Sequence, residues 1–311
     1  MRLSEPGGFL AAMNTASTSL DELRREIDRV DDALHDLVMR RAELSLRIRE
    51  AKGDGPAFRP AREAQLLRRL VARHRGVLPA AVVARIWREM MAASLRLQEN
   101  VTVAVAQRAD QPGLWDLARD HYGSIGSMSE LASGAQVVRA VAEGEALIGV
   151  LPLPREDDAD PWWPVLAAGG GGRGQPRVVA RLPFVAAGNA RGERPGALAI
   201  ARQAPEPTGD DRSLLAVETA GQISRARLAE LLRQAGLAPG QHVAATAPGG
   251  GEARLSLIEV DRFVPADDAA VKALGETAAG AIDGGTIARA VVIGARSEEH
   301  TSELQSQFHL V

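Results

Sequence analysis

The sequence predicts an all-α unit of three helices at the N-terminus, followed by an α/β region and a βαββαβ module. Apolar residues between Leu20 and Ile48 recur in alternating steps of three and four, which is typical of one long helix with a single apolar seam. After Val101 short apolar runs alternate with loops, which is typical of strands interleaved with helices. The length of 311 residues also favours more than one domain.

Composition and charge restrict the classes of function. The chain is 45% hydrophobic with a formal net charge of −3, so it has no electrostatic reason to bind nucleic acid or a membrane surface. It contains no cysteine, which excludes disulfides and thiolate metal sites, and its six histidines form no helical ligand pair, so we expect no metal. Residues 1–18 lack the apolar run of a signal peptide. We therefore expect a disordered N-terminus and a soluble, cytoplasmic protein.

Three helices are predicted within residues 19–100. Ser19 and Glu22 form a capping-box pattern at the start of the first helix, which continues to Lys52. At 1.5 Å per residue this helix is roughly 48 Å long. Pro60 begins the second helix, and the third follows the segment GVLP. A continuous apolar seam on so long a helix favours a dimer in which two such helices pack together.

One seam position holds a cation. Arg41 stands between Leu37 and Leu44, and a buried guanidinium needs a nearby anion because it does not lose its proton. Further polar residues on or beside the apolar faces of the three helices are Arg24, Lys52, Arg62, Glu63, Ser94 and Gln98. Several fixed cations with one carboxylate and two neutral hydrogen-bonding groups predict a pocket for a small dianion. About 26 Å of helix separates Arg24 from Arg41, too far to hold one metabolite within a single chain, whereas an antiparallel dimer would bring Arg24 of one subunit towards Arg41 of the other.

These residues carry a resemblance to a known family. The segment LRREIDRVDDALHDLVMRRAELSLRIREAK, with RPAREAQLLRRL and SLRLQ after it, resembles the all-helical class of chorismate mutase from residue 20 to about residue 98. Seven polar positions agree in type, order and spacing. The resemblance implies an intertwined helical homodimer, and an isomerase that converts chorismate to prephenate by a [3,3] rearrangement in the shikimate pathway of aromatic amino acid biosynthesis. It implies no cofactor.

The resemblance also assigns the principal catalytic roles. It implies that Arg24 of the partner subunit and Arg41 hold the two carboxylates of chorismate, while Lys52 and Gln98 contact the ether oxygen. Clamping both carboxylates would hold the substrate in its reactive conformation. An ammonium and an amide donor would stabilise the charge that grows on the ether oxygen as its bond to carbon breaks.

The remaining roles concern the far end of the pocket. The resemblance implies that Arg62 lies at the carboxylate end, that Glu63 accepts a hydrogen bond from the ring hydroxyl, and that Ser94 closes the pocket. One position departs from the pattern. Arg59 stands where the family usually has an acidic residue near the hydroxyl, which puts that contact in doubt.

The second half departs further from any catalytic pattern. Residues 101–206 resemble a degenerate prephenate dehydratase, and residues 207–295 resemble a ferredoxin-like, amino-acid-sensing type of module. The run PRED follows the strand ALIGVLPL where the dehydratase family has Glu-Asn-Ser, and RPGALAIAR stands where it has a Thr-Arg-Phe signature. We expect this half to lack dehydratase activity and to support or regulate the dimer.

The last sixteen residues, 296–311, fit neither the helical nor the α/β pattern. Residues 296–311 resemble the translation of a sequencing adapter, so we expect them to be disordered and the natural chain to end a few residues past Ala295.

Other interpretations of the same residues remain open. An arginine in a helical seam often sets register or extends to solvent, and a Ser-Gln pair on a helix is usually structural. Two alternative functions follow: a fully bifunctional chorismate mutase–prephenate dehydratase, and a sensor that binds a related metabolite without catalysis.

Overall fold

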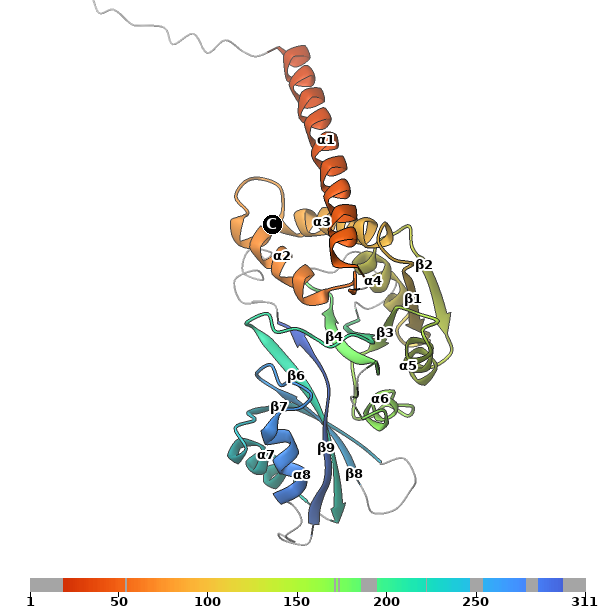
Figure 1. The fold of residues 1–311 in the computed structure, drawn as a ribbon, viewed down its shortest axis with the longest axis vertical. Helices are drawn as coiled ribbons and strands as arrows, with labels where there is room; N and C mark the ends of the chain where they lie inside the picture. The colour runs from red at the N-terminus through yellow and green to blue at the C-terminus, as the bar shows by residue number, and fades with distance from the viewer. Residues whose placement is uncertain are drawn as a thin grey trace, which may run out of the picture.

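The computed structural model describes residues 19–53, 55–170, 172, 174–185, 195–221, 223–246, 254–277 and 285–298. Three helices precede an α/β part that is built on one mixed sheet (Figure 1). Within these ranges no helix is both long and apolar enough to cross a membrane. The segments expected to be disordered, residues 1–18 and nearly all of 296–311, lie outside the described residues.

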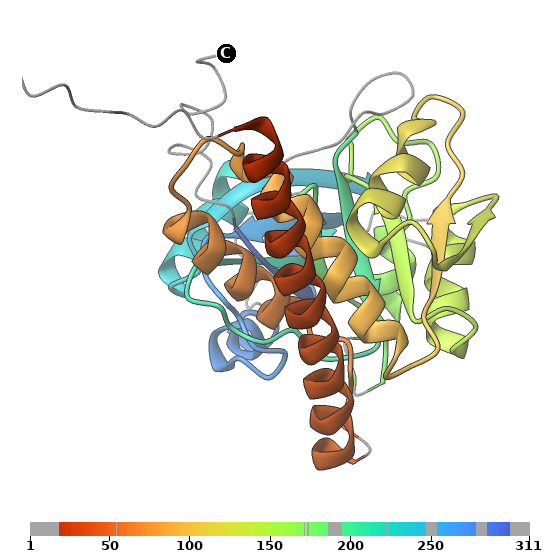
Figure 2. The ribbon, with the colours of Figure 1, turned by 90° about the horizontal axis from the view of Figure 1, so that it is seen from above.

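The first helix, α1 (Leu20–Lys52), has the predicted ends. Ser19 and Glu22 form the capping box, and Gly53 follows the last turn. The N-terminal half of α1 extends away from the rest of the chain, and its C-terminal half lies across the third helix (Figures 1 and 2). No residue of α1 is buried. Its exposed seam residues are Leu20, Leu23, Ile27, Val30, Leu34, Leu37, Leu44 and Ile48.

The helices α2 (Pro60–Arg73) and α3 (Ala80–Arg96) pack on each other and on the α/β part. Pro60 occupies the first turn of α2, where its missing N–H would have no partner. Phe58, in the loop before α2, is buried in one core of the α/β part and meets Tyr122 edge to face. The helical unit is therefore joined to the α/β part through α2, α3 and this loop.

The sheet contains nine strands in the order β2-β1-β3-β5-β4-β9-β6-β8-β7. In its first half, alternate residues of β1 point to two cores, one under α4 and the other under α5 and α6. The elements of this half are β1 (Thr102–Ala106), α4 (Gly113–Tyr122), β2 (Ser127–Leu131), α5 (Gly134–Glu143), β3 (Ile148–Pro152), α6 (Trp163–Ala168), β4 (Arg177–Leu182) and β5 (Ala197–Ala201).

The second half of the sheet has the element order strand, helix, two strands, helix, strand. Its elements are β6 (Asp211–Gly221), α7 (Arg225–Gln234), β7 (Pro239–Thr246), β8 (Arg254–Val260), α8 (Ala269–Thr277) and β9 (Gly285–Ser297). All pairings among these strands are antiparallel, and a third core lies between the strands and the two helices. Strand β9 also pairs in parallel with β4 through Gly294 and Val178, which makes one sheet of the two halves.

The first residues of the tail that we expected to be disordered, Arg296 and Ser297, belong to strand β9, so the module extends two residues past its expected boundary at Ala295. Strand β9 continues through Arg296 to Ser297, opposite Arg212 and Asp211 of β6. A buried ion pair stabilises this end of the strand, because the guanidinium of Arg296 donates a hydrogen bond of 2.6 Å to the buried carboxylate of Glu259.

Candidate active site

The contact between α1 and α3 brings three of the predicted residues together. Arg41, half-buried in the middle of α1, donates to Ser94 Oγ at 2.6 Å and to the carbonyl of Met90 at 3.3 Å. Ser94 is only 8% exposed. One turn later the Gln98 amide donates to the Ser94 carbonyl at 3.0 Å. Arg41 of α1 thus meets Ser94 at one junction between the two helices, and Gln98 lies one turn after Ser94.

The guanidinium of Arg41 is not neutralised by a carboxylate within the described part of the chain. Its partners are neutral oxygens, and burial lowers its pKa from the ordinary value. An arginine nevertheless stays charged at any physiological pH. A partly desolvated cation that has only neutral partners is a favourable place for an anionic ligand.

Three predicted residues stand apart from this junction. Lys52 is the last residue of α1 and Arg62 lies in the first turn of α2; both are exposed, and no side-chain hydrogen bond joins them to the described residues. Arg24 lies in the projecting half of α1, where its side chain pairs with Asp21 at 3.5 Å. About 26 Å of helix separates it from Arg41, so the two cannot hold one small molecule within a single chain.

Glu63 belongs to a second group of polar side chains, away from the junction of Arg41 and Ser94. Its carboxyl lies at the interface of α2 and α3 with α4, in a small cavity that Arg88, His121 and Tyr122 also line. Burial raises the pKa of Glu63 to about 7, and the nearby Arg88 opposes that rise. Burial and Arg88 together lower the pKa of His121.

Arg88 organises this second cluster, which we call the Glu63 cluster: Glu63, Arg88, His121 and Tyr122. The guanidinium of Arg88 lies 2.9 Å from His121 Nε2 and donates to the Phe184 carbonyl at 2.8 Å. Six residues along α3 separate Arg88 from Ser94, which turns their side chains about 120° apart on the helix. The junction around Ser94 and the Glu63 cluster around Arg88 therefore occupy different faces of α3. Within a single chain, the predicted site residues are thus divided between two places.

The sequence did not lead us to Arg49 or to the partners of Glu63 in its cluster. Arg49 lies two turns after Arg41 on the same stripe of α1 and donates to the Gln98 carbonyl. That eight-residue spacing was a usable signal for Arg49. His121 and Arg88 are 33 residues apart and had no local signal, because only the packing of α4 on α3 joins them.

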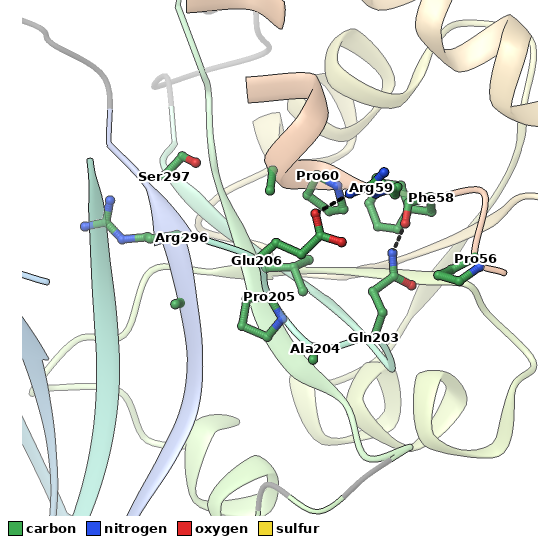
Figure 3. Close-up of a pocket in the computed structure, with 13 residues that line it drawn as sticks. Pro56, Phe58, Arg59, Pro60, Gln203, Ala204, Pro205, Glu206, Arg296 and Ser297 are labelled. Carbon is green, nitrogen blue, oxygen red and sulfur yellow. Dashed lines mark hydrogen bonds and ion pairs between the residues drawn. The ribbon is translucent and has the colours of Figure 1, made fainter. Parts of the chain in front are cut away.

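The departure at Arg59 has a structural partner. Arg59 Nη2 lies 2.7 Å from Glu206 Oε2, in the segment that connects β5 to β6 (Figure 3). A cation at this position therefore pairs with the α/β part. An acidic residue here would repel Glu206.

The two atypical segments of the second half are now placed. In the segment PRED, Arg155 pairs with Asp157 at 3.0 Å, and Glu156 pairs with Arg225. The described part of the segment RPGALAIAR, residues 195–202, contains β5, whose five residues are all buried and apolar. Neither segment presents a hydroxyl group to a common site among the described residues.

Comparison with known proteins agrees with the resemblance in the helical unit. Residues 23–99 match the family chorismate mutase type II. A bifunctional chorismate mutase/prephenate dehydratase of Pseudomonas aeruginosa is 31% identical over 141 residues, which cover 43% of this chain and 38% of that protein. The protein of the same description from Neisseria gonorrhoeae is 38% identical over 92 residues, which cover 28% of this chain and 25% of the relative. The match thus spans less than half the length of these relatives.

Solved structures resemble a larger part of the chain, at low similarity. One described as a quorum quenching acylase, GqqA, has a TM-score of 0.44 at 16% identity and covers 64% of this chain and 95% of its own. A prephenate dehydratase from Arthrobacter aurescens, solved with L-Phe, has a TM-score of 0.43 at 10% identity and covers 64% and 90%.

Proposed function

We propose that this chain, whose residues 23–99 form a chorismate mutase type II domain, isomerises chorismate to prephenate. The observation that carries the proposal is the junction of Arg41, Ser94 and Gln98, where a partly buried cation has only neutral partners. Chorismate carries two carboxylates, so it supplies the anion that this guanidinium lacks.

The reaction requires only that these side chains are correctly positioned and carry the right charge. In the [3,3] rearrangement a carbon–carbon bond forms as the carbon–oxygen bond of the ether breaks, without proton transfer, nucleophile or cofactor. Arg41 would hold one carboxylate and keep the substrate in its reactive conformation. Gln98, and Lys52 after a change of its exposed rotamer, would donate to the ether oxygen as charge grows there.

The proposed active enzyme is a homodimer in which α1 packs against α1 of a second copy. The exposed apolar seam on a helix with no buried residue supports it, because such a seam is stable when another apolar surface covers it. An antiparallel pairing would bring the partner's Arg24 towards Arg41, which supplies the second carboxylate contact. Arg62 and Glu63 would complete the site only if the start of α2 turns towards α1.

We further propose that the α/β part is not a dehydratase, and that its βαββαβ unit is a ferredoxin-like module with a supporting or regulatory role. Support comes from the buried apolar strand β5 and from the ion pairs of the PRED segment, one of which lies within the segment while the other joins it to Arg225 of α7. The alternative is a bifunctional chorismate mutase/prephenate dehydratase, which the description of the relatives favours. A second alternative is a sensor that binds chorismate without converting it.

One set of assays separates these functions. The purified full chain is incubated with chorismate, and chorismate, prephenate and phenylpyruvate are measured over time at neutral pH. Formation of prephenate alone is the expected result, and Lys52→Ala should reduce its rate by about 100-fold. Phenylpyruvate formed above the spontaneous rate would establish the bifunctional enzyme. Binding of chorismate without turnover would leave only the sensor.

A further inference from the structure

Arg49 is a second arginine of α1 that binds the end of α3. It lies in the last turn of α1 and donates a hydrogen bond to the backbone carbonyl of Gln98. Arg41 binds the same helix four residues earlier, at the hydroxyl group of Ser94. The helix α1 therefore contacts α3 at two points, which lie about 12 Å apart along α1 and about 6 Å apart along the end of α3.

These polar contacts fix the position of α1 on α3, because apolar packing within the chain contributes little to it. No residue of α1 is buried, and its apolar seam is exposed. With a single contact at Ser94, α1 could pivot on α3. A second contact further along α1 sets the angle between the two helices, and Arg49 supplies that contact.

The backbone of Gln98 has a particular need for this contact. The helix α3 ends at Arg96, and Gln98 lies in the turn that follows it. Carbonyl groups at the end of a helix lack partners within the helix and lie at the negative end of its dipole. A guanidinium both satisfies such a carbonyl and complements the dipole. Arg49 therefore holds the backbone of Gln98 against α1.

The side chain of Gln98 is also held in place. Its amide donates to the Ser94 carbonyl at 3.0 Å. A primary amide has two N–H donors, so the second remains available to a ligand. Ser94 accepts from Arg41 through its hydroxyl group and from Gln98 through its carbonyl. Together with the contact from Arg49, these hydrogen bonds form a chain that begins and ends on α1.

We propose that Arg49 is a positioning residue for the mutase reaction, a role that rests on the proposed function. By holding the Gln98 backbone, Arg49 keeps the second N–H of the amide directed at the ether oxygen of chorismate bound to Arg41. Charge grows on this oxygen as the carbon–oxygen bond breaks, so a misplaced amide weakens the contact most in the transition state. A displacement of about 1 Å can cost up to about 100-fold in rate.

Steady-state kinetics of chorismate conversion by the full chain test this role. Arg49→Ala should lower kcat by about tenfold and change KM by less than about twofold, because lost alignment affects the transition state more than the bound substrate. Arg49→Lys keeps a cation that can bind a carbonyl at a helix end, so it should recover most of kcat. Arg47→Ala removes an exposed arginine of the same helix and should keep the parent values.

A double-mutant cycle separates positioning of Gln98 from a general structural effect. If Arg49 acts through the Gln98 amide, its removal should matter little once that amide is gone. Arg49→Ala should therefore change kcat by less than about twofold in the background of Gln98→Ala, whereas a purely structural role would lower kcat by the same factor in both backgrounds. Circular dichroism and the melting temperature verify that each variant is folded.

Failure of the proposed function and failure of the Arg49 role give different results. A parent protein that converts no chorismate overturns both. An active parent that is slowed by Gln98→Ala but not by Arg49→Ala retains the proposed function and overturns the role of Arg49. That role is also overturned if Arg49→Ala raises KM alone, or if its effect on kcat persists undiminished in the background of Gln98→Ala.

Discussion

Arg41 and Ser94 are joined by a hydrogen bond of 2.6 Å that links the middle of α1 to the end of α3. The serine hydroxyl in turn donates to the Met90 carbonyl at 2.7 Å, so the hydroxyl both accepts from the guanidinium and donates to the helix backbone. These two hydrogen bonds fix the orientation of the partly buried Arg41 guanidinium before a ligand binds. Preorganisation of this kind reduces the cost of binding an anion.

Replacement of Arg41 tests the centre of the proposed site. Arg41→Ala should lower kcat/KM for chorismate by about 100-fold or more, because a charge-assisted contact to the substrate is lost in a partly desolvated site. The rate of chorismate consumption measures the effect. Arg47→Ala, an exposed arginine of the same helix, is the matched control and should keep the parent rate. Equal rates in the two variants would remove Arg41 from the site.

Subunit mixing tests whether Arg24 acts across a dimer. Arg24→Ala and Arg41→Ala should each be nearly inactive alone. After unfolding and refolding as an equal mixture, half of the dimers are mixed, and each mixed dimer has one intact site, so about a quarter of the parent activity should return. Activity that stays at the level of the separate variants would show that Arg24 and Arg41 do not belong to one shared site.

The exposed seam of α1 gives a test of the dimer itself. Leu34→Asp places a charge in the middle of the seam and should shift the protein from dimer to monomer, because an unpaired carboxylate is costly to bury. Sedimentation velocity over a range of concentrations measures the change. Asp32→Ala, which alters an exposed polar position on the same helix, should leave the dimer intact. A parent protein that is monomeric at all concentrations would contradict the prediction.

Glu63 should make stability depend on pH. Its pKa is raised from 4.5 to about 7 in the folded chain, so the folded state holds the proton more tightly than the unfolded state does. This contribution is fully present below pH 4.5 and is lost as pH rises to about 7, with a total of at most about 3 kcal/mol. Glu63→Gln removes the titrating group, so it should be more stable than the parent above pH 7 and nearly equal to it near pH 4.5.

Urea unfolding of both proteins across this range measures the difference in free energy of unfolding. His121 has the opposite effect, because its lowered pKa makes the folded state lose stability as pH falls below 6.5. It is present in both proteins, so its contribution largely cancels in the difference. A difference between Glu63→Gln and the parent that does not change with pH would show that Glu63 titrates normally.

Gly294 should be required where the two halves of the sheet meet. A Cβ at this position would lie 2.3 Å from the Val178 carbonyl oxygen and 2.4 Å from its amide nitrogen. Gly294→Ala must therefore separate β9 from β4, and we expect a loss of about 1–3 kcal/mol in the free energy of unfolding. Chemical denaturation measures it. Gly55→Ala is the control, since a Cβ there meets its nearest neighbour at an ordinary 3.5 Å, and its effect should be much smaller.

The local features of the fold could be read from the sequence because they depend on neighbours along the chain. The capping box at Ser19, the end of α1 at Lys52 and the start of α2 at Pro60 all occur as predicted. Strand β2 was not predicted, because it lies at the edge of the sheet and most of its side chains are exposed. Without one buried face, a strand has no alternating apolar pattern.

The sequence by itself determined the three helices, the seam of α1 and the polar residues of its candidate site, since helical periodicity decides which side chains share a face. It grouped Arg41, Ser94 and Gln98 in one candidate site, and in the folded chain Arg41 donates a hydrogen bond to Ser94. Only the tertiary structure decided that Glu63 faces Arg88 and His121, and that Arg59 pairs with Glu206, 147 residues away. Such pairings depend on how elements that are distant in the sequence pack together. That packing decides whether a charge is buried or exposed, and it has no counterpart in the local sequence pattern.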